Sequence, residues 1–225
     1  MNITIHDDVV QGSDEWHAMR CGLLTASEMK LVITPSKLQI AKNDKCRAHA
    51  YELAAQRITG YVEPQYITDA MMRGHEDEIH AADLYAEKYA PVQECGFITQ
   101  DFVGGMVLGF SPDRLVGDDG LIEIKSRSQK YQMQTVSNDE VPVEHIPQVQ
   151  TGMLISGRKW CDYVSYCSGM PMYVKRVHAC EETQEKLLAA AYEFEKSVQN
   201  IIDSYATNAV GLYPTERVIE QEMFA

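Results

Sequence analysis

The chain of 225 residues is 45% hydrophobic and 24% charged, a composition that is ordinary for a globular protein and excludes wholesale disorder. Its 33 Asp and Glu outnumber its 20 Lys and Arg, which gives a formal net charge of −13. This acidity excludes a protein that coats nucleic acid through its bulk charge, but it is compatible with a local basic patch.

The first half of the chain predicts three helices, each of which begins at a residue that favours a helix N-terminus. Thr25-Ala26-Ser27-Glu28 is typical of a capping box, in which the Glu28 side chain reaches back to the backbone of Thr25. Glycine and proline residues mark the helix ends. The expected helices span residues 25 to about 35, 43 or 44 to 60, and 68 to about 89.

The second half of the chain alternates strands and helices. The expected elements are strands at 93–99, 104–110 and 121–126, a helix at 143–156, a hairpin of strands at 163–167 and 172–177, and a long amphipathic helix at about 181–205. This order predicts a mixed α/β fold. The lack of a repeat or a linker predicts one domain over residues 1–225, with a motif-bearing core at about 12–178 and a C-terminal tail after the last helix.

Several other kinds of site and segment are not expected. The sequence has no apolar run of about 18 residues and no N-terminal signal pattern, which predicts a cytoplasmic protein without a membrane span. Six cysteines are scattered without a C-x-x-C pair, which argues against zinc and iron–sulfur sites. His75 and His80 lie five residues apart, so they do not share the helix face that a metalloprotease H-E-x-x-H motif requires.

Two carboxylates and a lysine stand at strand ends in the middle of the chain. Asp113 follows the expected strand at 104–110, and Glu123 and Lys125 are two residues apart on the next strand, so they share one face of it. If the two strands pair across the turn, Asp113 lies beside Glu123. Carboxylate oxygens, with the Ile124 carbonyl as a third donor, suit a hard cation such as Mg²⁺. Lys125 would orient or deprotonate the attacking water and stabilise charge on a phosphate.

Each part of this constellation is a common structural feature on its own. A Glu-x-Lys pair on a strand is often a surface salt bridge, and Ser-Pro-Asp is a common turn. The combination of Pro112-Asp113 with Glu123-Ile124-Lys125 is more specific, because it resembles the PD-(D/E)-x-K nuclease signature.

Further blocks on either side of this signature resemble the YqaJ-like viral recombinase family, the family of bacteriophage lambda exonuclease. They are Glu15–Glu28, Arg73–Glu78, and Gln148-Val149-Gln150 with Met153, and they occur in the family's order. The resemblance implies a restriction-endonuclease-like core, with a mixed central β-sheet flanked by α-helices. It also implies a 5′→3′ exonuclease that uses Mg²⁺, or Mn²⁺ in its place, and leaves a 3′ overhang on linear duplex DNA. No family motif matches the C-terminal helix and tail.

The resemblance also implies roles for individual residues. Asp113, Glu123 and the Ile124 carbonyl match the metal ligands, and Lys125 matches the catalytic lysine. Glu78 matches a helix-borne acid that points into the same site, where it would hold a second metal or a water. Without the resemblance, a solvated helix carboxylate is the simpler interpretation of Glu78. Gln148 matches a glutamine that reaches the metal site. Gln150, two residues later, cannot share the helix face of Gln148.

A pocket for a 5′-phosphate is the second implied site. Ser27 is expected in the first turn of a helix, where free N–H groups and the helix dipole favour an anion, and Arg20 can bind phosphate bidentately. The alternative is that Ser27 only caps the helix and Arg20 pairs with a surface acid. Lys37 stands where lambda exonuclease has an arginine, so it keeps the charge but loses the fork geometry. The full set of predicted phosphate and DNA contacts is Arg20, Ser27, Ser111, Lys37, Trp16 and His145.

Three functions are compatible with these residues. The first is the exonuclease, which in this family is a ring-shaped homotrimer that works with a single-strand annealing protein in a bacterial host. The second is an endonuclease or repair nuclease with the same metal core and no ring. The third is a non-catalytic DNA-end-binding domain, which the presence of Asp113, Glu123 and Lys125 argues against. DNA contact would use local bases, namely Arg20, Lys30, Lys37, Lys45, Arg47, Arg127 and Lys130.

Overall fold

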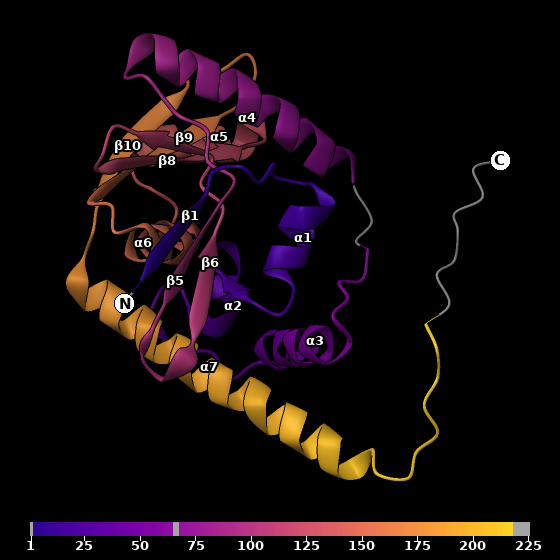
Figure 1. Ribbon diagram of the computed structural model, residues 1–225. Coiled ribbons are helices and arrows are strands. Elements are labelled where there is room, and N and C mark those ends of the chain that lie inside the picture. Colours follow the sequence, from indigo (N-terminus) through magenta and orange to yellow (C-terminus); the bar gives the residue numbers. More distant parts are fainter. Residues whose placement is uncertain (1, 65–67, 218–225) are drawn as a thin grey trace, which may run out of the picture.

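The computed structural model describes residues 2–64 and 68–217, which form two four-stranded sheets between helical layers (Figure 1). One sheet has the order β1 (Ile3–His6), β5 (Phe97–Asp101), β6 (Val107–Phe110) and β2 (Leu24–Thr25). The other has the order β10 (Tyr173–His178), β9 (Trp160–Tyr166), β8 (Gly120–Ser126) and β7 (Arg114–Val116). A two-stranded hairpin pairs β3 (Ile33–Thr34) with β4 (Gln39–Ile40).

Both larger sheets are mixed, because β2 runs parallel to β6 and β8 runs parallel to β9, whereas their other neighbours are antiparallel. The helices are α1 (Asp14–Arg20), α2 (Met29–Val32), α3 (Asp44–Thr59), α4 (Asp69–Lys88), α5 (Gln129–Asn138), α6 (Ile146–Ser156) and α7 (Glu181–Asn208). Short 3₁₀ turns cover Ala26–Glu28, Val103–Gly105 and Val143–His145. The mixed α/β fold with helices flanking mixed sheets is therefore confirmed. In the described part of the chain, no helix is long and apolar enough to cross a membrane.

Two apolar clusters hold the layers together. The helix α4 packs Ala81, Ala82 and Tyr85 onto Ile122 and Val164 of the β8–β9 pair. A larger apolar cluster joins strands β2, β5 and β6 to helices α2, α3, α6 and α7. In Figure 1, α4 lies along one side of the molecule and α7 along the opposite side, beneath α6, α2 and α3. The sites described below lie between these two outer helices.

The long, well-capped helices match the sequence-based expectations. Asn43 caps α3, Gly60 ends it in a left-handed conformation, and Thr68 caps α4. The sequence analysis missed α1 and α5, and both lack the apolar stripe that marks a helix in a sequence. No residue of α1 is buried, and the buried residues of α5 are Gln132 and Thr135.

A buried polar network fastens α4 to the second sheet. The Tyr85 hydroxyl donates to Asp162 Oδ2 at 2.6 Å, and Arg176 donates to both carboxylate oxygens of Asp162 at 2.8 and 2.9 Å. The Arg176 guanidinium also stacks on the ring of Trp160, 3.6 Å from its centroid. Because Asp162 is buried, it depends on these donors to offset its desolvation.

We expect the substitution Tyr85→Phe to lower the free energy of unfolding by about 1–2 kcal/mol, because it removes one hydrogen bond from a buried carboxylate. Urea unfolding measures this difference. Tyr89→Phe is the matched control, because Tyr89 stacks on Tyr85 but is exposed to solvent. Equal effects of the two substitutions would show that the Tyr85 hydroxyl contributes nothing through Asp162.

Candidate active site

The short strand β7 brings Asp113 to the centre of β8. Arg114 pairs with Ile122 in the antiparallel β7–β8 ladder, and the preceding Asp113 accepts a hydrogen bond at Oδ2 from the Ile124 N–H at 2.5 Å. The expectation that the strand at 104–110 pairs with β8 is wrong, because β6 lies in the other sheet. The juxtaposition itself is confirmed, since three paired residues directly after Asp113 are enough to make the hairpin.

Glu123 is the best-held carboxylate of the site. Its side chain is only 2% exposed, and its Oε1 atom accepts from Lys125 Nζ at 2.5 Å and from Gln148 Nε2 at 2.6 Å. Gln148 thus reaches the site from α6. Gln150 faces the other way, where it contacts the backbone of His178 and Cys180. Ile124 faces the apolar cluster under α4, so the Glu123 and Lys125 side chains share the opposite face of β8.

Glu78 is the one member of the acidic run on α4 that joins this cluster. Glu76 is exposed, and Asp77 turns to Ser126, whose hydroxyl donates to it at 2.5 Å. Glu78 Oε1 lies 3.7 Å from Arg114 Nη1. Burial raises the pKa of Glu78, the charge of Glu123 adds to this rise, and the charge of Arg114 opposes it. Glu78 therefore lies within the electrostatic reach of Glu123 and is more than a solvated helix carboxylate.

The site holds more negative than positive charge. Burial, followed by the charges of Glu123 and Glu78, raises the pKa of Asp113 well above its ordinary value. Burial by itself would lower the pKa of Lys125, but the charges of Glu123 and Asp113 outweigh it, so the pKa of this lysine is raised. Lys125 is therefore an ammonium at neutral pH, which favours a role in orienting water and stabilising charge over a role as a base.

The donor set fits a hard divalent cation. Among residues 2–64 and 68–217, no group of three His, Cys, Asp or Glu side chains is arranged as a complete metal site. Mg²⁺ does not need one, because it commonly binds through one or two carboxylates and keeps several waters. Asp113 and Glu123 supply two buried, mutually repelling carboxylates, and a bound cation would relieve that repulsion.

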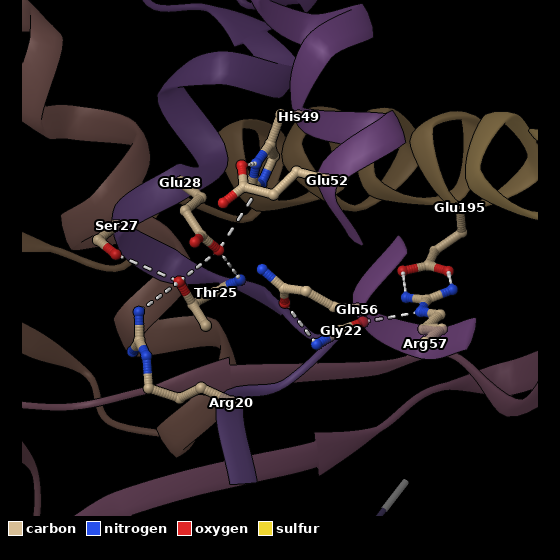
Figure 2. Close-up of polar contacts among 10 residues, drawn as sticks. All are labelled: Arg20, Gly22, Thr25, Ser27, Glu28, His49, Glu52, Gln56, Arg57 and Glu195. Carbon is tan, nitrogen blue, oxygen red and sulfur yellow. Dashed lines mark hydrogen bonds and ion pairs between the residues drawn. The ribbon is translucent and has the colours of Figure 1, made fainter. Parts of the chain in front are cut away.

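Four predicted phosphate contacts lie together between α1 and β6. Trp16 Nε1 donates to Ser111 Oγ at 2.8 Å, and Arg20 Nη1 donates to the same atom at 3.4 Å. The Arg20 guanidinium stacks on Trp16, 4.3 Å from the ring centroid, and its Nη2 donates to Thr25 Oγ1 at 3.3 Å. Figure 2 shows that Ser27 and Arg20 both approach the Thr25 hydroxyl, with 3.2 Å between the hydroxyl oxygens of Thr25 and Ser27.

The structure changes the interpretation of two residues of the predicted pocket. Ser27 lies in the first turn of a short helical segment, a three-residue 3₁₀ turn followed by the four residues of α2, so the helix dipole behind it is small. Lys37 is exposed in the β3–β4 turn and makes no hydrogen bond or ion pair with Arg20, Ser27 or Ser111 among the described residues, so its contact with DNA stays a prediction. The pocket therefore rests on Arg20 and hydroxyl groups.

His145 lies near Lys125, and it makes no hydrogen bond to Arg20, Ser27 or Ser111 among the described residues. Its Nε2 is 3.1 Å from Arg127 Nη1, and its ring stacks on Tyr163, with 5.5 Å between centroids. Burial, followed by the charges of Lys125 and Arg127, lowers the pKa of His145 to about 3. A neutral His145 can accept from Arg127 and so fix the direction of that guanidinium.

Three further residues of these sites were not predicted from the sequence: Thr25, Arg114 and Tyr163. Tyr163 pairs with Glu123 across β9 and β8, and its hydroxyl is buried without a hydrogen-bond partner among the described residues. Arg114 directly follows Asp113, so its position in the sequence is a signal that was available. Tyr163 becomes visible only when the parallel β8–β9 register is known.

The family model of the YqaJ-like viral recombinase domain matches residues 15–159. The alkaline exonuclease LHK-Exo of Laribacter hongkongensis is 32% identical, with a TM-score of 0.78 over 89% of this chain and 100% of that one, both alone and in complex with dAMP. A phage-related exonuclease of Haemophilus somnus 129PT has the same fold, at 12% identity and a TM-score of 0.59 over 81% of this chain and 96% of that one. No curated protein matches the chain.

We expect Asp113→Asn to stabilise the metal-free protein. The raised pKa of Asp113 means that ionising it costs folding stability at a pH above that pKa. An amide removes the charge but can still accept from the Ile124 N–H. In a chelating buffer near pH 8 the melting temperature of the variant should exceed that of the wild type.

The pH dependence gives this prediction its control. As the pH falls from the raised pKa of Asp113 towards the ordinary carboxyl pKa, the wild type takes up the proton itself, so the gain of the variant should shrink. A gain that is the same at every pH, or no gain at all, would contradict the raised pKa that burial and the neighbouring carboxylates give to Asp113. Thermal unfolding at several pH values measures it.

Proposed function

Since the chain belongs to the YqaJ-like viral recombinase family and is a DNA exonuclease, we propose that it degrades one strand of linear duplex DNA in the 5′→3′ direction, with Mg²⁺, and leaves a 3′ overhang. The single observation that carries this proposal is the convergence of Asp113, Glu123, Lys125 and Gln148 at one end of the β7–β8 hairpin. Two carboxylates that suit a metal ion, with a protonated lysine beside them, support metal-assisted phosphodiester hydrolysis.

Asp113, Glu123 and the Ile124 carbonyl would hold the metal, and Glu78 would hold a second ion or a water. When bound, Mg²⁺, or Mn²⁺ in its place, supplies Lewis-acid polarisation of the scissile phosphate and lowers the pKa of a water. Gln148 keeps Glu123 in place through its hydrogen bond. Lys125 carries a positive charge towards the phosphate, where negative charge develops in the transition state.

The hydroxyl of Ser111 supports the choice of a 5′-phosphate. Its oxygen accepts hydrogen bonds from Trp16 and Arg20, so its own proton remains for a further acceptor such as a phosphate oxygen. Arg20 adds a fixed positive charge, because its guanidinium is stacked on Trp16. Ser27 adds a second hydroxyl. Ser111 is two residues from Asp113, which connects the phosphate pocket to the metal centre.

Duplex DNA would lie against basic side chains near Asp113 and Glu123. Arg127 and Lys130 both lie over the exposed ring of Tyr131, at 5.0 and 5.5 Å from its centroid. A surface that combines cations with an aromatic ring suits the phosphate backbone and the nucleobases of a single DNA strand. The proposal also includes a ring-shaped homotrimer, a single-strand annealing protein as partner, and a phage or prophage origin with action in the bacterial cytoplasm. These follow from family membership.

We expect Glu123→Ala and Lys125→Ala each to lower the rate of digestion of a 5′-phosphorylated linear duplex at least about 100-fold, because each removes a group that acts on the reacting phosphate. The measurement follows release of nucleotides with Mg²⁺ present and with chelator. Glu182→Ala and Lys186→Ala are the matched controls, since these residues pair with each other on the surface of α7. Digestion that survives chelation, or a product with a 5′ overhang, would overturn the proposal.

We expect light scattering to give a solution mass three times the chain mass of 25.4 kDa. A ring that surrounds DNA should also degrade long duplexes processively and leave closed circular DNA intact. A monomeric mass together with cleavage of closed circles would favour an endonuclease with the same metal core instead.

A further inference from the structure

The hydroxyl of Thr25 has one proton and two lone pairs, and the structure accounts for all three. The hydroxyl donates to Glu28 Oε2 at 2.7 Å, and the backbone N–H of Thr25 donates to the same oxygen at 2.9 Å. With its proton committed to Glu28, Thr25 Oγ1 can only accept from its two other neighbours, Arg20 Nη2 at 3.3 Å and Ser27 Oγ at 3.2 Å.

In this bonding pattern, Glu28 determines the direction in which the Thr25 hydroxyl points. Thr25 is 2% exposed, so water cannot replace a lost partner. While the Thr25 proton points to Glu28, both lone pairs of the hydroxyl are left for Arg20 and Ser27. Figure 2 shows the chain of contacts from Glu28 through Thr25 to Arg20 and Ser27.

The helix α3 holds this arrangement from behind. Buried His49 lies next to Glu28, with its Nε2 atom 3.8 Å from Glu28 Oε2, and its other ring nitrogen is 3.0 Å from Glu52. Gln56 Oε1 accepts from the Gly22 N–H at 2.8 Å, and Arg57 Nε donates to the Gly22 carbonyl at 2.7 Å. The loop that carries Thr25 is therefore fixed at two points along α3.

The last support comes from α7, the helix without a family motif. Arg57 donates to both carboxylate oxygens of Glu195 at 2.7 and 2.8 Å, a bidentate pair that Figure 2 shows to the right of Gly22. Bidentate pairs of this kind fix orientation as well as distance. The rigidity of the pocket thus draws on both α3 and α7.

We propose that Glu28 is a positioning residue for the phosphate pocket: by accepting the hydrogen bond of the Thr25 hydroxyl, it directs the lone pairs of that oxygen towards Arg20 and Ser27 and so holds the Arg20 guanidinium for the terminal phosphate. This rests on the proposed function, in which Arg20 binds that phosphate. Glu28 would act through Thr25 and would not touch the DNA. The role goes beyond the capping box, because the backbone N–H of Thr25 alone would not orient its hydroxyl.

Electrostatics alone gives the opposite expectation. A carboxylate this close to a phosphate pocket repels the phosphate, so removing its charge should strengthen binding of a phosphorylated end. Positioning predicts weaker binding on loss of the Glu28 side chain, in spite of the lost repulsion. The sign of the effect therefore separates the two roles.

The experiment compares KM and kcat for two duplexes that differ only in a 5′-phosphate or a 5′-hydroxyl on the degraded strand. Glu28→Ala should raise the KM for the phosphorylated duplex about tenfold, since a hydrogen bond to a charged group is disturbed. The preference for the phosphorylated end should fall by the same factor. Glu28→Gln should restore most of it, because an amide oxygen can accept both hydrogen bonds from Thr25.

A second variant keeps the test independent of the capping box. Thr25→Val removes the hydroxyl with little change in shape and should reduce the preference as Glu28→Ala does. The double variant should be no worse than either single one, because both act through the same hydrogen bond. Glu63→Ala is the matched control: Glu63 is exposed and lines the same cleft of about 660 Å³, but it makes no hydrogen bond to Thr25 among the described residues.

The outcomes separate the inference from the function on which it rests. A wild type without preference for the phosphorylated end, or a preference that survives Arg20→Ala, overturns the pocket itself. If Arg20→Ala removes the preference, the pocket stands and the other variants decide the role of Glu28. A preference that rises in Glu28→Ala and Glu28→Gln, or an equal loss on both duplexes, then overturns its role as a positioning residue.

Discussion

The repulsion between the carboxylates of Asp113, Glu123 and Glu78 is the constraint on which the rest of the structure depends. Three acids, one directly before β7, one on β8 and one on α4, influence one another electrostatically, and Lys125 and Arg114 balance only part of their charge. Such an arrangement costs stability, so it persists only where the surrounding structure fixes it. The unbalanced charge is also what would favour the divalent cation of the proposed function.

Each of the three carboxylates is held in place against this repulsion by a different part of the fold. Asp113 is held by a backbone N–H within a short hairpin, and Glu123 by Gln148 from α6. Glu78 is carried by α4, which the buried Asp162 network and an apolar face fasten to β8 and β9. No attachment alone resists the repulsion. The geometry of the site therefore depends on where α4 and α6 lie relative to β8.

The sequence predicted the parts of this arrangement that are local. Glu123 and Lys125 are two positions apart on a strand and so share one face, and the N-caps together with Gly60 and Pro91 gave the bounds of α3 and α4. It failed where tertiary context decides. The three residues of β7 are too few for a pattern, and the helical segment after Thr25 ends at Val32, a little before the expected end near residue 35. Lys37 lies in the exposed β3–β4 turn, so its role in the pocket stays a prediction. Family resemblance supplied Glu78 and Gln148, which spacing alone would have left as surface residues.

The connection between β6 and β7 holds Ser111 of the proposed phosphate pocket close to Asp113 of the carboxylate cluster. Ser111 and Asp113 are two residues apart, so their Cα atoms are at most about 7 Å from each other. Pro112 between them has a restricted φ and accepts a hydrogen bond at its carbonyl from Gln11, which limits the movement of this connection. A strand end bound at Ser111 and Arg20 would therefore present to the metal a bond close to that end. Under the proposed function, this short connection would tie the position of the cut to the strand end that is bound.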